Sequence, residues 1–332
     1  MKKTFLMVAA VAAMLVATGF TACKPNSPQT PKEVDIYVAG YDKSGTEDVA
    51  KVWKNGKELY DLTDGSKDAV ANSIFVVGGD VYTAGYERNG TKMVAKVWKN
   101  DKELYELTDG SKSGEANSVF VADDKVYTAG YDGKVAKLWK NKSATDLTDG
   151  LYKAEARSVF VAGSNVYTAG YVHNGTNEVA KVWRNSKDIF TLTSNSGNAN
   201  SVFVVGEDVY TAGWEYNGTH NVAKVWKNKK AIFQTDGTKN TIARSVHVVG
   251  DDIYVAVEEG SVAKVWKNKE ELYDLADNGE AHSIVVHNGD VYVAGRERDG
   301  SNNIAKVWKN GKELYTLADK GGAYSIFIAE RK

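Results

Sequence analysis

Apolar and polar positions alternate along this chain in short stretches that are typical of β-strands. Residues 73–77 and 81–86 are mostly β-branched or aromatic, and the turn residues Gly78-Gly79-Asp80 separate them. Two further stretches of this kind follow at 94–99 and 103–107. After the first 22 residues, no long stretch has the period of a helix. The pattern therefore predicts an all-β protein built from four-stranded units.

The same unit recurs seven times. A Val-Ala-Lys-Val-Trp-Lys-Asn segment spans 49–55, and its tryptophan returns about every 40 to 45 residues, at Trp53, Trp98, Trp139, Trp183, Trp226, Trp266 and Trp308. A Tyr-x-Ala-Gly-Tyr segment returns at Tyr37, Tyr82, Tyr127, Tyr167, Tyr210, Tyr254 and Tyr292. An Ala-x-Ser segment before apolar residues returns at Ser73, Ser118, Ser158, Ser201, Ser245, Ser283 and Ser325. Because three separate motifs each count to seven, we expect seven structural repeats.

Four-stranded units at this period are typical of β-propeller blades, whose sheets bury both faces against their neighbours. The repeats begin with a second-strand motif at 35–41 and end with a first-strand motif at 323–328. We therefore expect a seven-bladed β-propeller of four antiparallel strands per blade, closed by the C-terminal strand pairing with the N-terminal three. The predicted closing blade is 34–63 plus 323–329, and the others are about 71–108, 116–148, 156–193, 199–235, 243–276 and 281–318.

The repeat departs from the common propeller motifs. Its tryptophan precedes Lys or Arg, where WD40 repeats need Asp, and its second strand has one glycine, where kelch repeats need two. The Asp-box of sialidases is missing as well. The repeat resembles instead the uncharacterised Tyr-x-Ala-Gly / Ala-Lys-Val-Trp-Lys-Asn repeat lipoproteins of Bacteroidota. This resemblance covers residues 34–332 and implies no activity.

The N-terminus has the features of an export signal. Lys2 and Lys3 precede an apolar run at 5–16 that is too short for a stable membrane span. The four residues that end at Cys23 resemble a bacterial lipobox, and Cys23 is the only cysteine in the chain. We therefore predict a lipoprotein signal peptide over 1–22 and lipidation of Cys23. A plain signal peptide cut near this point and an N-terminal membrane anchor are the alternatives.

A tether is predicted between the lipid and the propeller. Residues 23–33 hold all three prolines among polar residues, which is a linker composition, so the folded domain is expected over 34–332. The expected location is the cell envelope, anchored to the outer membrane. Residues 24–27 lack the acidic side chains that direct some Bacteroidota lipoproteins to the surface, which leaves periplasmic and surface display both open.

Composition restricts the partners. The formal net charge of −1 becomes −3 without Lys2 and Lys3, which gives no basic field for nucleic acid and no polybasic membrane patch. We expect a monomer that binds a glycan or an envelope protein and touches the membrane only through Cys23. The chain has no Ser-His-Asp motif, phosphate loop or dinucleotide fingerprint, and its five histidines lack metal-ligand spacing. Neither a cofactor, a metal nor a catalytic residue is assigned.

The candidate ligand site lies on one face of the propeller. With strands called a to d from the innermost outward, the b-c and d-a connections share a face and are longer than the turns opposite. The residue between Ala and Ser in strand a is expected to form a polar ring at the mouth of a central channel, made of Asn72, Asn117, Arg157, Asn200, Arg244, His282 and Tyr324. With Glu115, Glu155 and Glu280 nearby, this ring offers the groups that a glycan needs. The alternative is that these residues bind no ligand and are polar only because the channel mouth of any propeller is wet and polar.

A second candidate set ends the strand-b motif. It is aromatic in five units, at Tyr41, Tyr86, Tyr131, Tyr171 and Trp214, and becomes Glu258 and Arg296 in the other two. These aromatics are candidates for stacking on sugar rings, and the alternative is packing between blades. The strand-c lysines are expected to make cation–π contacts, at Lys51, Lys96, Lys137, Lys181, Lys224, Lys264 and Lys306.

Three functional hypotheses follow. The first is a lipid-anchored, non-enzymatic protein that binds carbohydrate on the b-c/d-a face, and the alternative is a scaffold for another protein. A glycan hydrolase at the channel mouth ranks last. It would use the glutamates there, or a cluster of His247 and His282 with Arg244 and Glu280.

Overall fold

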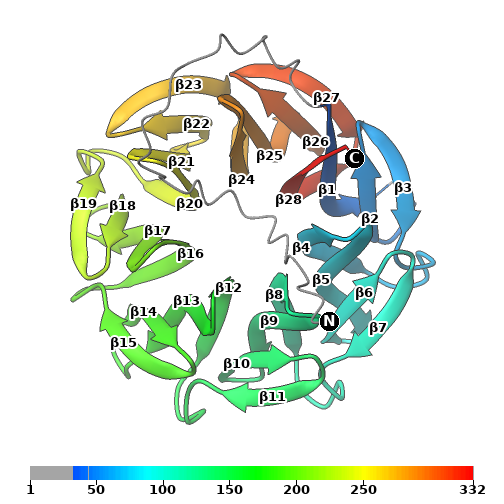
Figure 1. Ribbon diagram of the computed structural model, residues 1–332, viewed down its shortest axis with the longest axis horizontal. Coiled ribbons are helices and arrows are strands. Elements are labelled where there is room, and N and C mark those ends of the chain that lie inside the picture. Colours follow the sequence, from blue (N-terminus) through cyan, green and yellow to red (C-terminus); the bar gives the residue numbers. More distant parts are fainter. Residues whose placement is uncertain (1–32, 44, 332) are drawn as a thin grey trace, which may run out of the picture.

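The chain folds into seven four-stranded antiparallel blades around a central axis (Figure 1). The computed structural model describes residues 33–43 and 45–331. The predicted signal peptide, Cys23 and all but the last residue of the predicted tether lie outside these residues. Within them, 28 strands form the seven sheets, so the predicted seven-bladed β-propeller is confirmed.

Each blade runs from an innermost strand near the axis to an outermost strand at the rim, and its strands follow in that order. Blade 1 contains β28 (Gly321–Glu330), β1 (Val34–Asp42), β2 (Val49–Lys54) and β3 (Lys57–Asp61), and blade 2 contains β4 (Ala69–Val77), β5 (Asp80–Asn89), β6 (Lys92–Lys99) and β7 (Lys102–Glu106). Blade 3 contains β8 (Gly114–Ala122), β9 (Lys125–Asp132), β10 (Val135–Lys140) and β11 (Ser143–Asp146), and blade 4 contains β12 (Ala154–Ala162), β13 (Asn165–His173), β14 (Glu178–Arg184) and β15 (Lys187–Thr191). Blade 5 contains β16 (Gly197–Val205), β17 (Asp208–Tyr216), β18 (Asn221–Lys227) and β19 (Lys230–Gln234). Blade 6 contains β20 (Thr241–Val249), β21 (Asp252–Glu259), β22 (Val262–Lys267) and β23 (Glu270–Ala276), and blade 7 contains β24 (Gly279–His287), β25 (Asp290–Asp299), β26 (Asn302–Lys309) and β27 (Lys312–Ala318).

The ring closes through β28. This last strand pairs antiparallel with β1 over its whole length, from Val34 opposite Glu330 to Asp42 opposite Gly321. The pairing covers the inner edge of β1, which would otherwise be an unpaired sheet edge. The predicted closure is therefore confirmed, and it joins the two ends of the repeat region.

The serine of the Ala-x-Ser motif connects each blade to the next. Ser73 Oγ accepts a hydrogen bond of 3.0 Å from the backbone N–H of Val119, and Ser325 Oγ accepts one of 3.2 Å from Ile74 across the closure. The five other pairs repeat this bond, at Ser118–Val159, Ser158–Val202, Ser201–Val246, Ser245–Ile284 and Ser283–Ile326. The recurring serine therefore has a structural role at every seam between blades.

The motif tryptophans form the apolar core between blades. Trp98, for example, belongs to one buried cluster with Val52 and Leu62 of the preceding blade. Six of the seven tryptophans are 1 to 2 % exposed, and Trp266 is only half-buried. Burying such a ring removes about 150 to 250 Å² from water, so the series stabilises the whole ring of blades.

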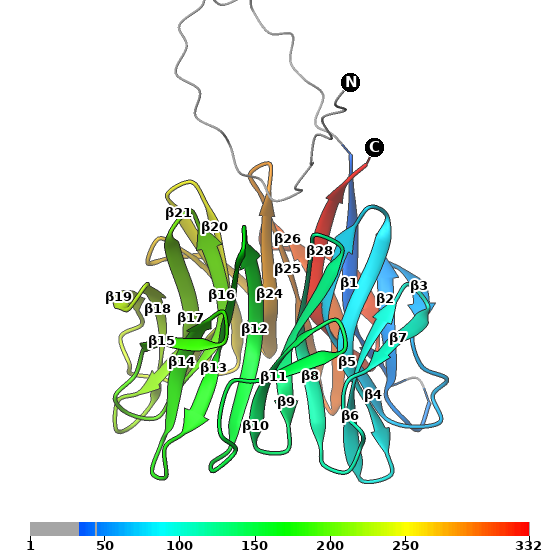
Figure 2. The same ribbon diagram turned by 60° about the horizontal axis from the view of Figure 1, so that its bottom comes forward.

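The asparagine two residues after each tryptophan fixes the turn between strands c and d. Asn100 has a positive φ of 56° and accepts a hydrogen bond of 2.9 Å from the N–H of Val81, at the start of strand b. The six equivalent residues do the same, at Asn55, Asn141, Asn185, Asn228, Asn268 and Asn310. These bonds tie the c-d turns to the a-b turns on one face, which is uppermost in Figure 2, where β28 ends and β1 begins. The b-c and d-a connections lie on the opposite face.

The lysine contacts differ from the expectation. The strand-c lysines bind carboxylates, as in Lys51, whose Nζ lies 2.6 Å from Glu58 and 2.7 Å from Asp61. The ring contacts come instead from the lysine after the tryptophan, as in Lys54, whose Nζ lies 5.0 Å from the centre of the Tyr37 ring. The predicted cation–π role of the Lys51 series was therefore wrong, because strand d supplies acidic partners that sequence order alone did not place beside strand c.

Candidate functional site at the mouth ring

The seven variable residues of the Ala-x-Ser motif occupy seven β-bulges. The pairing of strand a with strand b shifts by one residue between Ala71 and Ser73, so Asn72 has no partner across the ladder. The same shift skips each equivalent residue of the other six blades. A bulge turns its extra side chain away from the regular alternation of the strand. We call these residues the mouth ring: Asn72, Asn117, Arg157, Asn200, Arg244, His282 and Tyr324.

The glycine of the strand-b motif accommodates the bulge. A β-carbon on Gly85 would lie 1.9 Å from the carbonyl oxygen of Val70. Five other blades have a glycine at this place, and β21 has Val257, which nothing in the structure explains. The Ala-Gly dipeptide of strand b and the Ala-x-Ser segment of strand a therefore form the same bulge together.

Several mouth-ring side chains reach from one blade to the next. The amide nitrogen of Asn72 donates to Glu115 Oε1 at 2.9 Å and to the carbonyl oxygen of Ala116 at 3.2 Å. Asn117 and Asn200 donate to the equivalent carbonyl oxygens of Ala156 and Ala243, each at 2.9 Å. Arg157 donates to Asn200 Oδ1 at 3.0 Å. These bonds connect neighbouring blades and fix the direction of the polar groups.

The strand-b set lies directly beside the mouth ring. Each of its members pairs across the ladder with the residue two positions before a mouth-ring residue, for example Tyr131 with Glu115 and Arg296 with Glu280. Tyr171 is 1 % exposed, Tyr41 and Tyr131 are also buried, and Tyr86 and Trp214 are half-buried. Each of these five aromatic side chains is therefore buried or half-buried, and none is exposed.

Blade 3 contributes a buried carboxyl group. Glu115 accepts hydrogen bonds from Asn72 and, at 3.2 Å, from the Tyr131 hydroxyl. Burial raises the pKa of Glu115, and the nearby negative charge of Glu155 raises it further. Burial likewise raises the pKa of Tyr131, so this hydroxyl stays protonated and donates.

Blade 4 contributes an ion-paired carboxylate. Glu155 lies 2.9 Å from Lys153 Nζ and 3.3 Å from Arg157 Nη2. Burial opposes its ionisation, but Arg157 and Lys153 outweigh burial and hold the pKa of Glu155 below its usual value. The Arg157 guanidinium lies over the Tyr171 ring at 5.3 Å. Burial also raises the pKa of Tyr171 to about 12.

Blades 6 and 7 replace the strand-b aromatics with charged groups. Glu280 lies 3.0 Å from Arg244, 2.5 Å from Arg296 and 3.2 Å from Arg298, and Arg244 also pairs with Glu258. Burial opposes ionisation of Glu280, but Arg244 and Arg296 outweigh it and lower its pKa. A cavity of about 70 Å³ adjoins this group of charges.

The remaining part of the ring is aromatic. The rings of His282 and Tyr324 lie 4.7 Å apart, and Tyr324 stacks on Tyr41 at 5.9 Å with 24° between the planes. His282 Nε2 lies 3.7 Å from a Glu280 oxygen and has no hydrogen-bond partner among the described residues. Burial and the charges of Arg244 and Arg296 hold the pKa of His282 well below its usual value, so this imidazole is neutral.

His247 belongs to a different layer. It stands three residues after Arg244 in β20 and packs against Phe203, with 4.7 Å between ring centres. It completes a chain of ring contacts, which we call the aromatic collar, through Phe327, Phe75, Phe120, Phe160, Phe203 and His247. The expected cluster therefore brings His282, Arg244 and Glu280 together, while His247 packs in the collar.

Sequence reasoning missed two of the charged residues at this site. Arg298 and Lys153 lie at the end of β25 and just before β12, outside every repeated motif, yet they bind Glu280 and Glu155. Among residues 33–43 and 45–331, no group of three or more His, Cys, Asp or Glu is placed to hold a metal ion. The same part of the chain contains no apolar helix long enough to cross a membrane.

The fold defines a closed seven-bladed β-propeller, with one variable residue in the innermost-strand bulge of every blade. No protein-family model matches the chain, and no curated protein matches it. Among solved structures, the chain is similar to the extracellular domain of BT4673 from B. thetaiotaomicron, with 11 % identity and a TM-score of 0.46, over 82 % of this chain and 39 % of that one. It is similar to BamB from Moraxella catarrhalis, with 9 % identity and a TM-score of 0.44, over 82 % of this chain and 89 % of that one. It is also similar to Porphyromonas gingivalis dipeptidyl peptidase 4, with 9 % identity and a TM-score of 0.45, over 84 % of this chain and 58 % of that one. The chain thus spans well under half of the first of these proteins.

Proposed function

We propose that this protein is a lipid-anchored, non-enzymatic binding protein of the cell envelope that recognises carbohydrate at the mouth ring. One observation carries the proposal. In every repeat the variable residue stands in the same bulge of the innermost strand, and side-chain contacts of this series connect neighbouring blades from Asn72 round to Tyr324. A set of convergent polar groups at one place is typical of a ligand site.

The charges of the mouth ring favour a ligand rich in hydroxyl groups. Glu155 is paired with Arg157 and Lys153, and Glu280 is paired with arginines, so neither carboxylate presents an isolated charge. Such pairs offer hydrogen-bond donors and acceptors side by side, which suits a sugar better than a strongly charged ion.

A hydrolase stays the last hypothesis. Glycosidic cleavage usually needs one protonated carboxyl group opposite an ionised one. Glu155 and Glu280 are ion-paired with lowered pKa values, and the carboxyl group with a raised pKa, Glu115, is bonded to Asn72 and Tyr131. This arrangement favours binding over acid catalysis.

The first test is a glycan array with the full-length chain carrying Cys23→Ser, followed by calorimetry on any glycan that binds. Arg157→Ala should weaken binding about tenfold, since a hydrogen bond from a charged group contributes about 1.5 to 3 kcal/mol. The matched control is Arg184→Ala, an exposed arginine at the end of β14 on the opposite face. Silence across the array, or equal binding by both variants, would contradict the proposal.

A protein scaffold is the second candidate, and one surface feature favours it. Leu151 and Tyr152 are 66 % and 43 % exposed in the connection before blade 4, where the connections before blades 2 and 3 have Ser-Lys. Tyr152 lies beside His173, with 5.8 Å between ring centres. If no glycan binds, a photo-crosslinker at position 151 should capture one defined envelope protein in living cells, and a crosslinker at Ser164 on the opposite face should not.

Envelope anchoring rests on the sequence of the first 23 residues. The chain expressed with a clickable palmitate analogue should incorporate the label, and Cys23→Ser should abolish the incorporation. Label that persists in Cys23→Ser would exclude this cysteine as the acylation site.

A further inference from the structure

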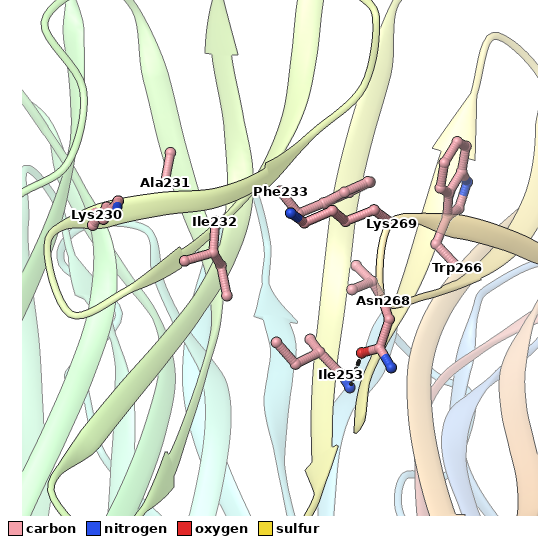
Figure 3. A pocket seen from close by; sticks show the side chains of 9 residues that line it. Lys230, Ala231, Ile232, Phe233, Ile253, Trp266, Asn268 and Lys269 are labelled. Carbon is pink, nitrogen blue, oxygen red and sulfur yellow. Dashed lines mark hydrogen bonds between the residues drawn. The ribbon is translucent and has the colours of Figure 1, made fainter. Parts of the chain in front are cut away.

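An apolar cavity opens between blades 5 and 6, away from the mouth ring. Its volume is about 360 Å³, within the usual range for small-molecule sites. Ile232 and Phe233 of β19 form one wall, and Ile253, Val255 and Trp266 of blade 6 form the other (Figure 3). It lies close to the c-d turns, whereas the mouth ring lies toward the b-c/d-a face.

The c-d turn at this seam differs from the turn at two others. In two other seams a glycine allows the c-d turn to approach a tyrosine of the preceding blade closely. A β-carbon on Gly56 would lie 2.5 Å from the Tyr315 ring, and one on Gly311 would lie 2.6 Å from the Tyr273 ring. Blade 6 has Lys269 at this place, with a φ of 82°. Lys142 and Lys229 stand at the same place in blades 3 and 5, but only Lys269 has a positive φ among these three lysines. At this seam the Phe233 and Trp266 rings meet with 5.4 Å between their centres, and Trp266 is half-buried.

Strand d also lacks its usual acidic residue here. Ala231 occupies the position at which Glu58, Glu103, Asp188, Glu271 and Glu313 bind the strand-c lysines of their own blades. The cavity lining therefore has no carboxylate beside β19. Blade 3 also lacks the acid, at Ala144, and a turn lysine also occurs at Lys142 and Lys229, but only the seam between blades 5 and 6 combines the missing acid with a lysine in the facing turn.

The charges around the cavity are positive. Lys230 and Lys269 line its opening and are exposed, and neither has an ion pair within the described part of the chain. In Figure 3, Lys269 extends from its turn toward Phe233. The indole nitrogen of Trp266 has no hydrogen-bond partner among the described residues. An apolar cavity with two unpaired ammonium groups is complementary to a small anion that carries an aromatic group.

We infer that the cavity between blades 5 and 6 is a second binding site, which takes a small aromatic anion such as an aryl carboxylate or sulfonate. The aromatic group packs against the contacting rings of Phe233 and Trp266, whose centres lie 5.4 Å apart, and the anionic group meets Lys230 and Lys269. This site is independent of the carbohydrate proposal, because the two share no residue.

The test uses 1-anilinonaphthalene-8-sulfonate as the probe and the full-length Cys23→Ser chain. The dye should bind saturably at one site, and Lys230→Glu with Lys269→Glu should weaken binding about fivefold or more through loss of attraction and added repulsion. The matched control is Lys312→Glu, the equivalent exposed lysine at the start of β27, which should leave the affinity unchanged. Ala231→Glu should also weaken binding, since it returns a carboxylate to the lining.

Competition tests the chemical class. Indole-3-acetate should displace the dye, and neutral indole at the same concentration should not. Displacement by both compounds alike, an equal effect of Lys312→Glu and Lys230→Glu, or absence of saturable dye binding would each overturn the inference. Because all these variants change exposed side chains, circular dichroism should show an intact fold in each.

Discussion

At the scale of single residues, the Ala-x-Ser motif combines three roles in three positions. Ala71 is fully buried, Asn72 stands in the bulge, and Ser73 binds the next blade. Only the middle position is released from the ladder, and this explains why it alone varies between repeats. The motif therefore combines two structural positions with one variable position.

The serine contact gives the first prediction. Ser73→Ala should lower the free energy of unfolding by about 1 to 2 kcal/mol, because the buried N–H of Val119 loses its acceptor. Urea denaturation would measure the change. Ser164→Ala, in an exposed a-b turn, is the control and should be neutral. An equal loss in both variants would show that the inter-blade bond does not stabilise the ring.

His247 gives a prediction for pH. It occupies a place in the aromatic collar where Phe75, Phe120, Phe160, Phe203 and Phe327 stand in other blades. Burial lowers its pKa from 6.5 to about 4. Below pH 6.5 the unfolded chain therefore binds a proton that the folded chain does not. The contribution of His247 to the free energy of unfolding is therefore fully present above pH 6.5 and is lost as the pH falls toward 4.

The corresponding variant is His247→Phe. At pH 5 it should raise the free energy of unfolding by about 2 kcal/mol through removal of this titration, and the gain should be much smaller at pH 7.5. Urea denaturation at the two pH values would measure the difference. His220→Asn, in the loop after β17, is the control. A gain that is the same at both pH values would mean that packing, and not protonation, causes it.

At the scale of elements, β28 decides whether the blades form a ring. Residues far apart in the chain meet along the pair of β28 and β1, and Ser325 adds the seam contact to Ile74. Propellers leave few exposed edges, and here the closing strand covers the inner edge of blade 1. Cooperativity between blades should therefore depend on this one strand.

Truncation after Lys320 tests that role. The shortened chain should lose cooperative thermal unfolding and should self-associate, since β1 then presents an unpaired apolar edge. Circular dichroism and size-exclusion chromatography would show both effects. Truncation after Glu330 is the control, because it removes the ion pairs of Arg331 with Glu33 and Asp35 but keeps β28. A monomeric, cooperatively unfolding product from the longer deletion would contradict the role of closure.

At the scale of the whole molecule, the two faces differ in their relation to the predicted anchor. β1 begins at Val34 on the face of the a-b turns, and the mouth ring lies toward the opposite face. A tether of 23–33 spans at most about 35 to 40 Å when fully extended. Anchoring at Cys23 would therefore leave the mouth ring pointing away from the membrane and open to a large ligand.

Immobilisation tests this orientation. The chain coupled to a sensor through Cys23, its only cysteine, should bind a polysaccharide that contains the glycan identified on the array. Coupling through Thr91→Cys in the Cys23→Ser background should block most of that binding, since Thr91 lies in the β5–β6 loop on the site face. Coupling through Ser164→Cys on the other face is the control. Equal binding in all three orientations would place the glycan site elsewhere.

The sequence by itself determined the number of blades, the strands of each blade and the closure. These features could be predicted because the same Trp, Tyr and Ser positions have the same packing role in each of the seven repeats. It also singled out the variable residues from Asn72 to Tyr324, which occupy equivalent bulges in the structure. The tertiary structure decided which charges meet. Glu280 binds Arg244 of the preceding blade, and Lys51 binds acids of strand d, and such partners depend on the geometry between strands and blades. The cavity at Trp266 also required the structure, because its lining comes from side chains of two different blades.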